Sequence, residues 1–381
     1  MDIQHIAPRV DLSMSAADEK KGFALENRNH LLFKQKNRWG LTVLSVVICL
    51  MLSPMLALSA FLPQIVTLVP VMLMLLLGYV GPVSAAACTA VIVSVSSAIM
   101  GVWGGMLSML LLVPVVIVGA YMVEKDSPFW LSAAGTGVTM FASMGVVMLI
   151  ISALTGMDIV TALSQTLQQA FASSGALGDS MLSMMTQMGL LTAQGGGSVD
   201  ISSIDAATRE QLIAALVMMV DTMLRLEIPM QMATGSVAAG VLGQVALRKG
   251  VLSRGDKVDY PPLRTWTVPK GWGRVLGATL AALYVLTLIV PSFTSSMFYV
   301  FTGVFEQIFA LQGIAAVCYY LNEKGKGHVA QGIVFALGYF AIRPAAILIG
   351  IADQTFDVVH RREKMEEETP NPFDPRTHDD K

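Results

Sequence analysis

The chain has 381 residues, of which 54% are hydrophobic and 14% are charged, and its formal net charge is −2. Soluble domains carry about 25% charged residues, so this composition excludes an ordinary soluble protein. The slightly acidic balance also argues against a nucleic-acid partner.

From Leu41 to Val123 the chain contains no Asp, Glu, Lys, Arg or His. A run of this length is several times the roughly 20 residues that a helix needs to cross a bilayer. The apolar segments are continuous rather than alternating, which favours helices over barrel strands, because a helix satisfies its own backbone groups in lipid. The sequence therefore predicts an all-α integral membrane protein in contact with the lipid bilayer.

We predict a polytopic transmembrane bundle of about eight or nine spans. The candidate helices cover residues 41–62, 64–80, 82–101, 105–123, 128–154, 228–248, 274–291, 296–321 and 329–351. The predicted regions are a polar N-terminal extension (1–40), a first bundle (41–154), an outer-face segment (155–227), C-terminal spans (228–351) with a basic loop (249–273), and a polar, disordered tail (352–381).

Basic residues flank these spans unevenly, and short basic flanks lie in the cytoplasm. Six Lys and Arg residues lie within 20–38 and seven lie within 248–274, and six intervening spans place both flanks on the cytoplasmic side. We therefore expect a multi-pass protein of the cell inner membrane with a cytoplasmic N-terminus. The tail is also basic at Arg361 and Arg362, so either this last flank breaks the rule or one candidate is a half-span.

The outer-face segment holds Met181, Met184, Met185 and Met188 at helical spacing. Thioethers can bind Cu(I), but the chain has 25 methionines throughout, and no His or Cys of this segment joins the four. We interpret them as adaptable packing and predict no metal site and no cofactor. Further on, Asp221 and Arg225 stand four residues apart on a predicted helix, where they are expected to pair.

No P-loop, HExxH or nucleophile-elbow motif occurs, so we expect no enzyme activity. The glycines of "GSVAAGVLGQ" (235–244) lack the dinucleotide-binding spacing, and we expect them to allow close helix packing.

The segment "PPLRTWTVPKGW" (261–272) has two interpretations, since its prolines prevent a continuous helix. It is either an interfacial anchor or a docking surface for a cytoplasmic or membrane protein partner. Tryptophan suits the headgroup layer, and Lys and Arg suit anionic lipid. The residues concerned are Arg264, Trp266, Pro269, Lys270 and Trp272.

Arg343 lies in the middle of an apolar run, where a lone charge costs about 2.5–3.5 kcal/mol on insertion scales and usually faces a partner or a cavity. Glu306 lies as far before the turn at Lys324-Gly325 as Arg343 lies after it, so an antiparallel hairpin would bring them to equal depth. We predict that the two pair. Gln307, Gln312 and Tyr339 are expected polar neighbours, and the group either locks the hairpin or lines a substrate cavity.

The C-terminal third resembles the YybS-like family of bacterial membrane proteins. The resemblance is carried by "PPLRTWTVP", "IFALQGIAAVCYYL" and "GIADQTFDVVHRR", with matching positions at Trp266, Pro269, Gln312, Gly313, Gly350, Asp353, Asp357 and Arg361. The layout of the early spans is also similar to the substrate-binding S components of energy-coupling-factor importers, which is a likeness of fold only.

Two functions therefore stay open. The first is binding or uptake of a small-molecule ligand in the manner of an S component, with an external energising partner. The second is a non-transporting membrane scaffold or assembly factor.

Overall fold

The computed structural model describes residues 39–58, 63–173, 206–268 and 270–356, and every regular element in them is helical. The N-terminal extension, the methionine cluster 181–188 and the part of the predicted tail after residue 356 lie outside the described residues. The elements are α2 (Trp39–Leu58), α3 (Pro63–Tyr79), α4 (Pro82–Glu124), α5 (Phe129–Thr155), α6 (Ile159–Ser173), α8 (Ala206–Ser253), η3 (Leu263–Thr265), α9 (Lys270–Ile289), α10 (Pro291–Glu323), α11 (His328–Ala336), η4 (Leu337–Ala341) and α12 (Arg343–Phe356).

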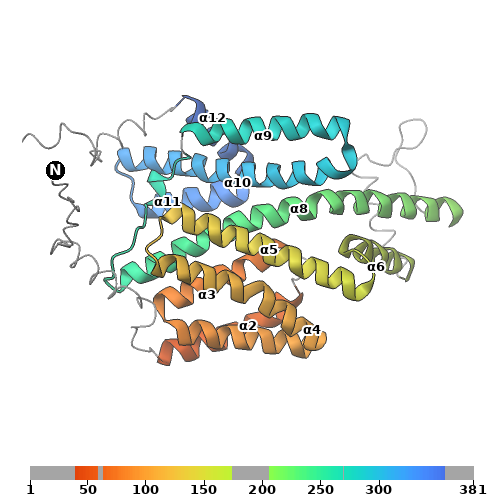
Figure 1. The fold of residues 1–381 in the computed structure, drawn as a ribbon, viewed down its shortest axis with the longest axis horizontal. Helices are drawn as coiled ribbons and strands as arrows, with labels where there is room; N and C mark the ends of the chain where they lie inside the picture. The colour runs from red at the N-terminus through yellow and green to blue at the C-terminus, as the bar shows by residue number, and fades with distance from the viewer. Residues whose placement is uncertain (1–38, 59–62, 174–205, 269, 357–381) are drawn as a thin grey trace, which may run out of the picture.

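Helix α8 lies at the centre of the bundle and packs against α3, α5 and α10 (Figure 1). Two of its glycines permit this approach. A Cβ atom on Gly240 would clash with the backbone of α5 at Ala133, and one on Gly250 would clash with the backbone of α3 at Gly78. The expected role of segment 235–244 in close helix packing is therefore confirmed.

Helix α4 is two helices that fold back on each other. Gly101 has φ 73° and ψ −175°, a backbone conformation that only glycine adopts readily. Gly105 then lies against Ser97 and Val93, which a straight helix would hold far away at 1.5 Å per residue. The chain therefore reverses at Gly101, close to the predicted break at Gly104-Gly105.

The predicted count of eight or nine spans is not supported. In the part of the chain that the structure describes, four helices are long and apolar enough to cross a membrane, namely Pro82–Glu124, Phe129–Thr155, Gly271–Ile289 and Ser296–Glu323. The number is five if one bent helix pair counts as a span. The difference arises because two predicted spans near the N-terminus form shorter apolar helices, Trp39–Met51 and Leu68–Tyr79, and because the predicted spans 82–101 and 105–123 are the two arms of the single element Pro82–Glu124. The predicted span 228–248 is part of central helix α8, whose polar Gln244 and Arg248 are fully buried.

The last predicted span, 329–351, is wrong as a single straight helix. Helices α11 and α12 meet at a bend of 107°. The π-helical turn η4 and the non-helical Ile342 (φ −123°, ψ 36°) separate them. Pro344 contributes to the break, because it has no N–H to continue the ladder.

Both ends of this α11–α12 hairpin lie at the same end of the bundle. Helix α11 begins just after α10 ends, and Arg264 bonds Asn322 at that end. At the close of α12, Gln354 packs against Gly273 in the first turn of α9. Since α9 and α10 are antiparallel and joined at Val290 (Figure 1), these contacts lie at one end of the molecule.

A fully buried arginine joins three segments at this same end. Arg248 of α8 has no exposed surface. Its Nη2 donates to the Ser127 carbonyl at 2.7 Å and to Ser132 Oγ at 2.6 Å, and its Nη1 donates to the Asp259 carbonyl at 2.5 Å. The fourth bond, from Nε to Gln244 Oε1, is 3.2 Å. Arg248 thus fixes the α4–α5 turn and the 256–260 segment to the central helix.

We predict that Arg248→Met lowers the free energy of unfolding by about 3–5 kcal/mol, because it leaves buried acceptors without their charged donor. The measurement is chemical denaturation of the purified protein in detergent micelles. The control is Arg274→Met, at an exposed arginine of α9, which should change stability by less than about 0.5 kcal/mol. Equal effects of the two substitutions would contradict a structural role for Arg248.

Candidate functional site

The turn between α5 and α6 is determined by local sequence. Gly156 takes the left-handed conformation (φ 70°) that ends α5. Two residues later, Asp158 caps the start of α6, with Oδ1 accepting the Thr161 amide at 2.9 Å and Oδ2 accepting the Thr161 hydroxyl at 2.6 Å. This turn directs α6 along α8.

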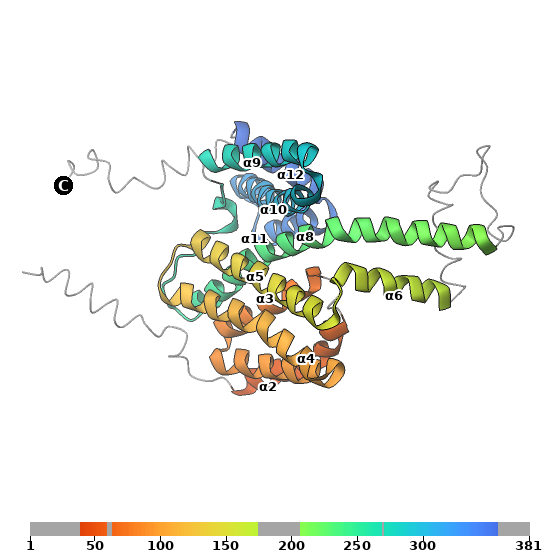
Figure 2. The same ribbon diagram turned by 45° about the vertical axis from the view of Figure 1, so that its right-hand side comes forward.

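Beyond this turn, α6 and the first half of α8 extend from the bundle side by side (Figure 2). Arg225 of α8 clamps them together. It bonds Asp221 at 2.8 Å through Nε and Thr161 at 3.0 Å through Nη2, and its Nη1 lies 3.6 Å from Asp158. Asp221 in turn accepts the Ser164 hydroxyl at 2.9 Å. The expected pairing of Asp221 with Arg225 is confirmed.

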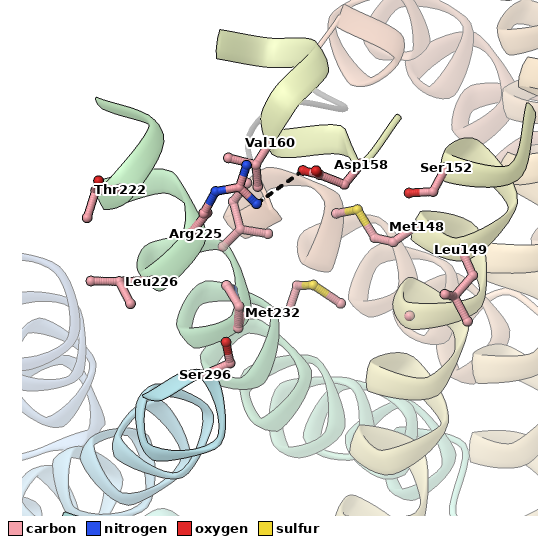
Figure 3. A pocket seen from close by; sticks show the side chains of 13 residues that line it. Met148, Leu149, Ser152, Asp158, Val160, Thr222, Arg225, Leu226, Met232 and Ser296 are labelled. Atoms are coloured by element: carbon pink, nitrogen blue, oxygen red, sulfur yellow. Dashed lines mark ion pairs between the residues drawn. The ribbon is translucent and has the colours of Figure 1, made fainter. Parts of the chain in front are cut away.

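A pocket of about 770 Å³ opens beneath this clamp. Figure 3 shows Arg225 facing Asp158 at one side, with Ser152 and Thr222 as further polar groups. A further polar group, Ser296, comes from α10. The rest of the lining is mainly apolar and comes from α5, α6 and α8: Gly145, Met148, Leu149, Val160, Leu226, Ile228, Pro229 and Met232. Ligand pockets of about 300–1,000 Å³ with apolar walls and a few convergent polar groups are the usual small-molecule sites.

Local contacts set the charge state of the clamp. Hydrogen bonds from the Thr161 side chain and amide, followed by the charge of Arg225, lower the pKa of Asp158. Hydrogen bonds from Arg225 and Ser164 lower the pKa of Asp221. The hydrogen bond to Asp221, aided by both carboxylates, raises the pKa of Arg225. All three groups are therefore ionised at neutral pH and fix two carboxylates around one guanidinium.

Pro229 adds a backbone group to this pocket. It stands inside α8 and has no N–H for the carbonyl four residues earlier, that of Arg225. That carbonyl can accept a bond from a ligand or from water. The described residues contain no group of three His, Cys, Asp or Glu side chains that could hold a metal ion.

Sequence analysis placed its candidate site elsewhere, in the C-terminal hairpin. The structure brings Glu306 and Arg343 together, with Oε2 and Nη2 3.6 Å apart. Gln307 is fully buried and donates from Nε2 to the Tyr339 hydroxyl at 3.1 Å. Gln312 lies further along α10 and bonds elsewhere, to Asp353 at 2.9 Å.

Within the strip 261–272, Trp266 lies neither at a surface anchor nor at a surface for docking. Trp266 is 3% exposed, and its indole packs on Phe129 and Trp130 and donates to the Pro261 carbonyl. Tryptophan can be buried in this way once its N–H has an acceptor. Trp266 is therefore neither a headgroup anchor nor part of a docking surface, whereas Trp272 is 62% exposed. Nothing is described for Pro269 or for the side chain of Lys270.

Four of the residues that carried the family resemblance, Gln312, Gly313, Gly350 and Asp353, converge where α10 crosses α12. Cβ atoms on Gly313 or Gly350 would clash with the facing helix backbone, so both positions require glycine. Beside them Gln312 bonds Asp353, Gln354 and the Val268 amide, which ties α12 to the strip. Asp357 and Arg361 lie outside the described residues.

The sequence did not predict the pocket beside Arg225 or the structural role of Arg248. The Asp221–Arg225 spacing gave a helix pair but no sign that Asp158, 63 residues before Asp221, would complete it. The signal available was the "TGMD" sequence, which ends one helix and caps the next. Arg248 was taken as one more basic flank residue, and its burial follows only from the tertiary packing.

Comparison with known proteins agrees with a membrane location. A family model described as "Predicted membrane protein (DUF2232)" matches residues 40–354, most of the chain. The chain belongs to this family. The match runs from α2 into α12 and therefore includes both the pocket between α5, α6 and α8 and the hairpin. Neither a curated protein nor a solved structure matches the chain.

We predict that the α6–α8 clamp loosens in acid. Because the folded-state pKa values of Asp158 and Asp221 are lowered, their contribution is complete above the ordinary value of about 3.9 and is lost as pH falls through the lower folded values. Spin labels at the exposed Gln165 and Met218 should give a narrow distance distribution at pH 7 that broadens below about pH 4.

The variant in which both aspartates become asparagine should show the broad distribution already at pH 7 and little change with pH. Asp256→Asn, at the other end of the molecule, should behave like the parent protein. A distribution of constant width down to pH 3 would show that these carboxylates do not hold the clamp.

Proposed function

We propose that this member of the DUF2232 family binds a small amphipathic molecule in the pocket between α5, α6 and α8. The observation that carries the proposal is the pairing of a largely apolar 770 Å³ pocket with the ion cluster of Arg225, Asp158 and Asp221 at its edge. An apolar body would lie against Met148, Leu149 and Met232. A polar end would meet Ser152, Thr222 and the Arg225 carbonyl.

We further propose binding rather than chemistry at this pocket. Its charged groups are committed to one another through short contacts, and the described lining offers no nucleophile with an adjacent base. A binding role of this kind is the one expected from the likeness to S components, in which capture is separate from the energising partner. We likewise propose that the chain is a YybS-like protein.

The scaffold hypothesis is weaker as a second candidate. It relied on docking through residues 249–273 and the termini, and within that segment the Trp266 side chain is buried against Phe129 and Trp130. A protein partner at this end of the molecule would instead meet Trp272 and Arg274, which are exposed.

The test fills the pocket without disturbing the fold. Gly145 lines the pocket, and a Cβ atom there would meet open space. We predict that Gly145→Leu abolishes a co-purifying small molecule that native mass spectrometry detects on the parent protein as an added mass. The matched control is Gly277→Leu on α9, where a Cβ also meets open space and which lies outside the pocket. Equal added mass on both variants, or none on the parent, would refute the proposal.

We also propose that the end of the bundle holding Arg248 is cytoplasmic. The structure gathers at that end Lys125, Lys249, Arg254, Lys257, Arg264, Arg274, Lys324 and Lys326. The opposite end, around the pocket, has Asp158, Asp221 and Glu227 with Arg225. This asymmetry follows the positive-inside pattern. It also supports a hairpin whose two ends face the cytoplasm.

Cysteine labelling of intact cells tests this orientation. The three native cysteines are buried and should give little background. A membrane-impermeant maleimide should label Gln165→Cys on α6, and it should reach Lys257→Cys, Lys326→Cys and Thr355→Cys only after the cells are opened. Labelling at 355 without labelling at 326 would mean that the hairpin crosses the membrane. Labelling at 257 in intact cells would reverse the orientation.

A further inference from the structure

The α11–α12 hairpin has an unusual backbone break within an apolar sequence. The π-helical turn η4 ends at Ala341, and α12 begins at Arg343 beside Pro344. Pro344 has no N–H for the carbonyl of residue 340. Irregular backbone at membrane depth is tolerated where it is buried in protein or lines a cavity, and π-helical turns are frequent at functional sites.

The polar groups around this break are incompletely hydrogen-bonded. The Nε and Nη2 atoms of Arg343 are buried and have no hydrogen-bond partner among the described residues. The Nη2 atom lies 3.6 Å from Glu306 Oε2, which is too long for a hydrogen bond. Gln307 Oε1 is also buried without a partner, although the Gln307 amide nitrogen is held by Tyr339. Two donors and one acceptor are thus left open within one small region.

Buried polar groups are normally satisfied, and each exception requires an explanation. A guanidinium fork is best matched by the paired oxygens of a carboxylate or phosphate. The surroundings admit such a group from the lipid, because Leu337 is 51% exposed, Ile342 is 55% exposed and the Arg343 side chain is 24% exposed.

We propose that the tip of the α11–α12 hairpin binds the anionic oxygen group, carboxylate or phosphate, of an amphipathic molecule through Arg343, and that one proton is taken up by Glu306 on binding. Gln307 Oε1 accepts a bond from the protonated carboxyl group of Glu306. The site shares no residue with the pocket between α5, α6 and α8, so it stands or falls independently of the proposed function.

The proton follows from charge balance. Without a ligand, Arg343 and Glu306 neutralise each other at 3.6 Å. An added anion would leave an uncompensated negative charge in a region of low dielectric, which is strongly unfavourable. A proton on Glu306 restores neutrality and releases Arg343 to the ligand.

The groups that face Glu306 allow this exchange. From α12 there is Arg343, and from η4 there is Tyr339, bonded through Gln307. From α8 there is Glu227, within electrostatic range of Glu306 and bonded to Gln231 at 2.9 Å. Helix α9 contributes Arg274 only in its first turn and Tyr284 against Phe298. Among the described residues, Arg343 is therefore the cation that a proton on Glu306 would replace.

The experiment uses the full chain in lipid nanodiscs and two probes, octanoate and octyl phosphate, with octanol as the neutral control. Isothermal titration calorimetry in two buffers of different ionisation enthalpy counts the protons taken up. We expect at least one of the two anions to bind with the uptake of about one proton, whereas octanol should cause no proton uptake. Which anion binds more tightly distinguishes the carboxylate from the phosphate class.

Variants assign the residues. Arg343→Lys keeps the charge but loses the fork and should weaken binding roughly ten- to hundred-fold. Arg343→Met should abolish it, and Arg274→Met should leave it unchanged. Glu306→Gln should still bind the anion, but without proton uptake and without pH dependence.

Four results would overturn the proposal: no binding of either anion to the parent protein, binding without proton uptake, full binding by Arg343→Met, or unchanged proton uptake by Glu306→Gln. If Arg343→Met does not fold, the nearly isosteric Glu306→Gln variant decides through its proton count. Its folding is checked by its thermal unfolding midpoint.

Discussion

The buried guanidinium of Arg248 is the interaction on which the arrangement of the bundle most depends. Its four hydrogen bonds reach α8, the turn before α5, α5 itself and the segment before η3. Asp259, whose carbonyl it binds, also accepts the Phe129 amide at the start of α5. Contacts between apolar helix faces are not directional, whereas hydrogen bonds are. The hydrogen bonds of Arg248 therefore fix the register of α5 against α8. The pocket depends on that register, since both helices line it.

The small residues act in the same direction by bringing backbones into contact. Gly240 against α5 and Gly250 against α3 leave no room for axial displacement, because neighbouring backbone atoms fill the space of a side chain. Lipid gives no hydrophobic driving force for helix association, so close van der Waals contact and interhelical hydrogen bonds must supply it. Gly313 and Gly350 make the equivalent contact between α10 and α12. The bundle and the hairpin are thus assembled by the same means.

Much of this fold is readable from the sequence where local chemistry decides it. Continuous apolar runs predict helices, and Gly-Pro or Gly-Gly steps predict their breaks to within a few residues, as at Gly81 and Gly101. The sequence does not show where a helix is surrounded. By composition, residues 228–248 are predicted to be a membrane span. In the structure they belong to α8, the helix that the other helices surround. By residue type, Trp266 was predicted to lie at an interface and Arg248 in a basic cytoplasmic flank, yet both side chains are buried and donate to backbone carbonyls.

The hairpin shows the same limit in another form. Counting about 1.5 Å per residue along two straight helices paired Glu306 with Arg343. The helix that leads from the turn to Arg343 is, however, broken before it reaches Arg343. The two side chains still lie together, because an unpaired charge in an apolar region is costly and the opposite charge lowers that cost. The electrostatic requirement was therefore a better guide than the geometry from which the pairing was first derived.

Arg248 and Arg343 differ in a way that separates structure from function. Each of the three side-chain nitrogens of Arg248 donates a hydrogen bond. Among the described residues, Arg343 has a single carboxylate at more than hydrogen-bond distance, and two of its nitrogens have no acceptor. Full satisfaction of a buried cation rigidifies a fold, whereas partial satisfaction leaves free energy that a ligand can release. A protein whose only task was to hold its helices together would gain stability by replacing both Arg343 and Glu306 with apolar residues. The presence of an incompletely bonded arginine at a helix break is therefore better explained by a molecule that completes its bonds.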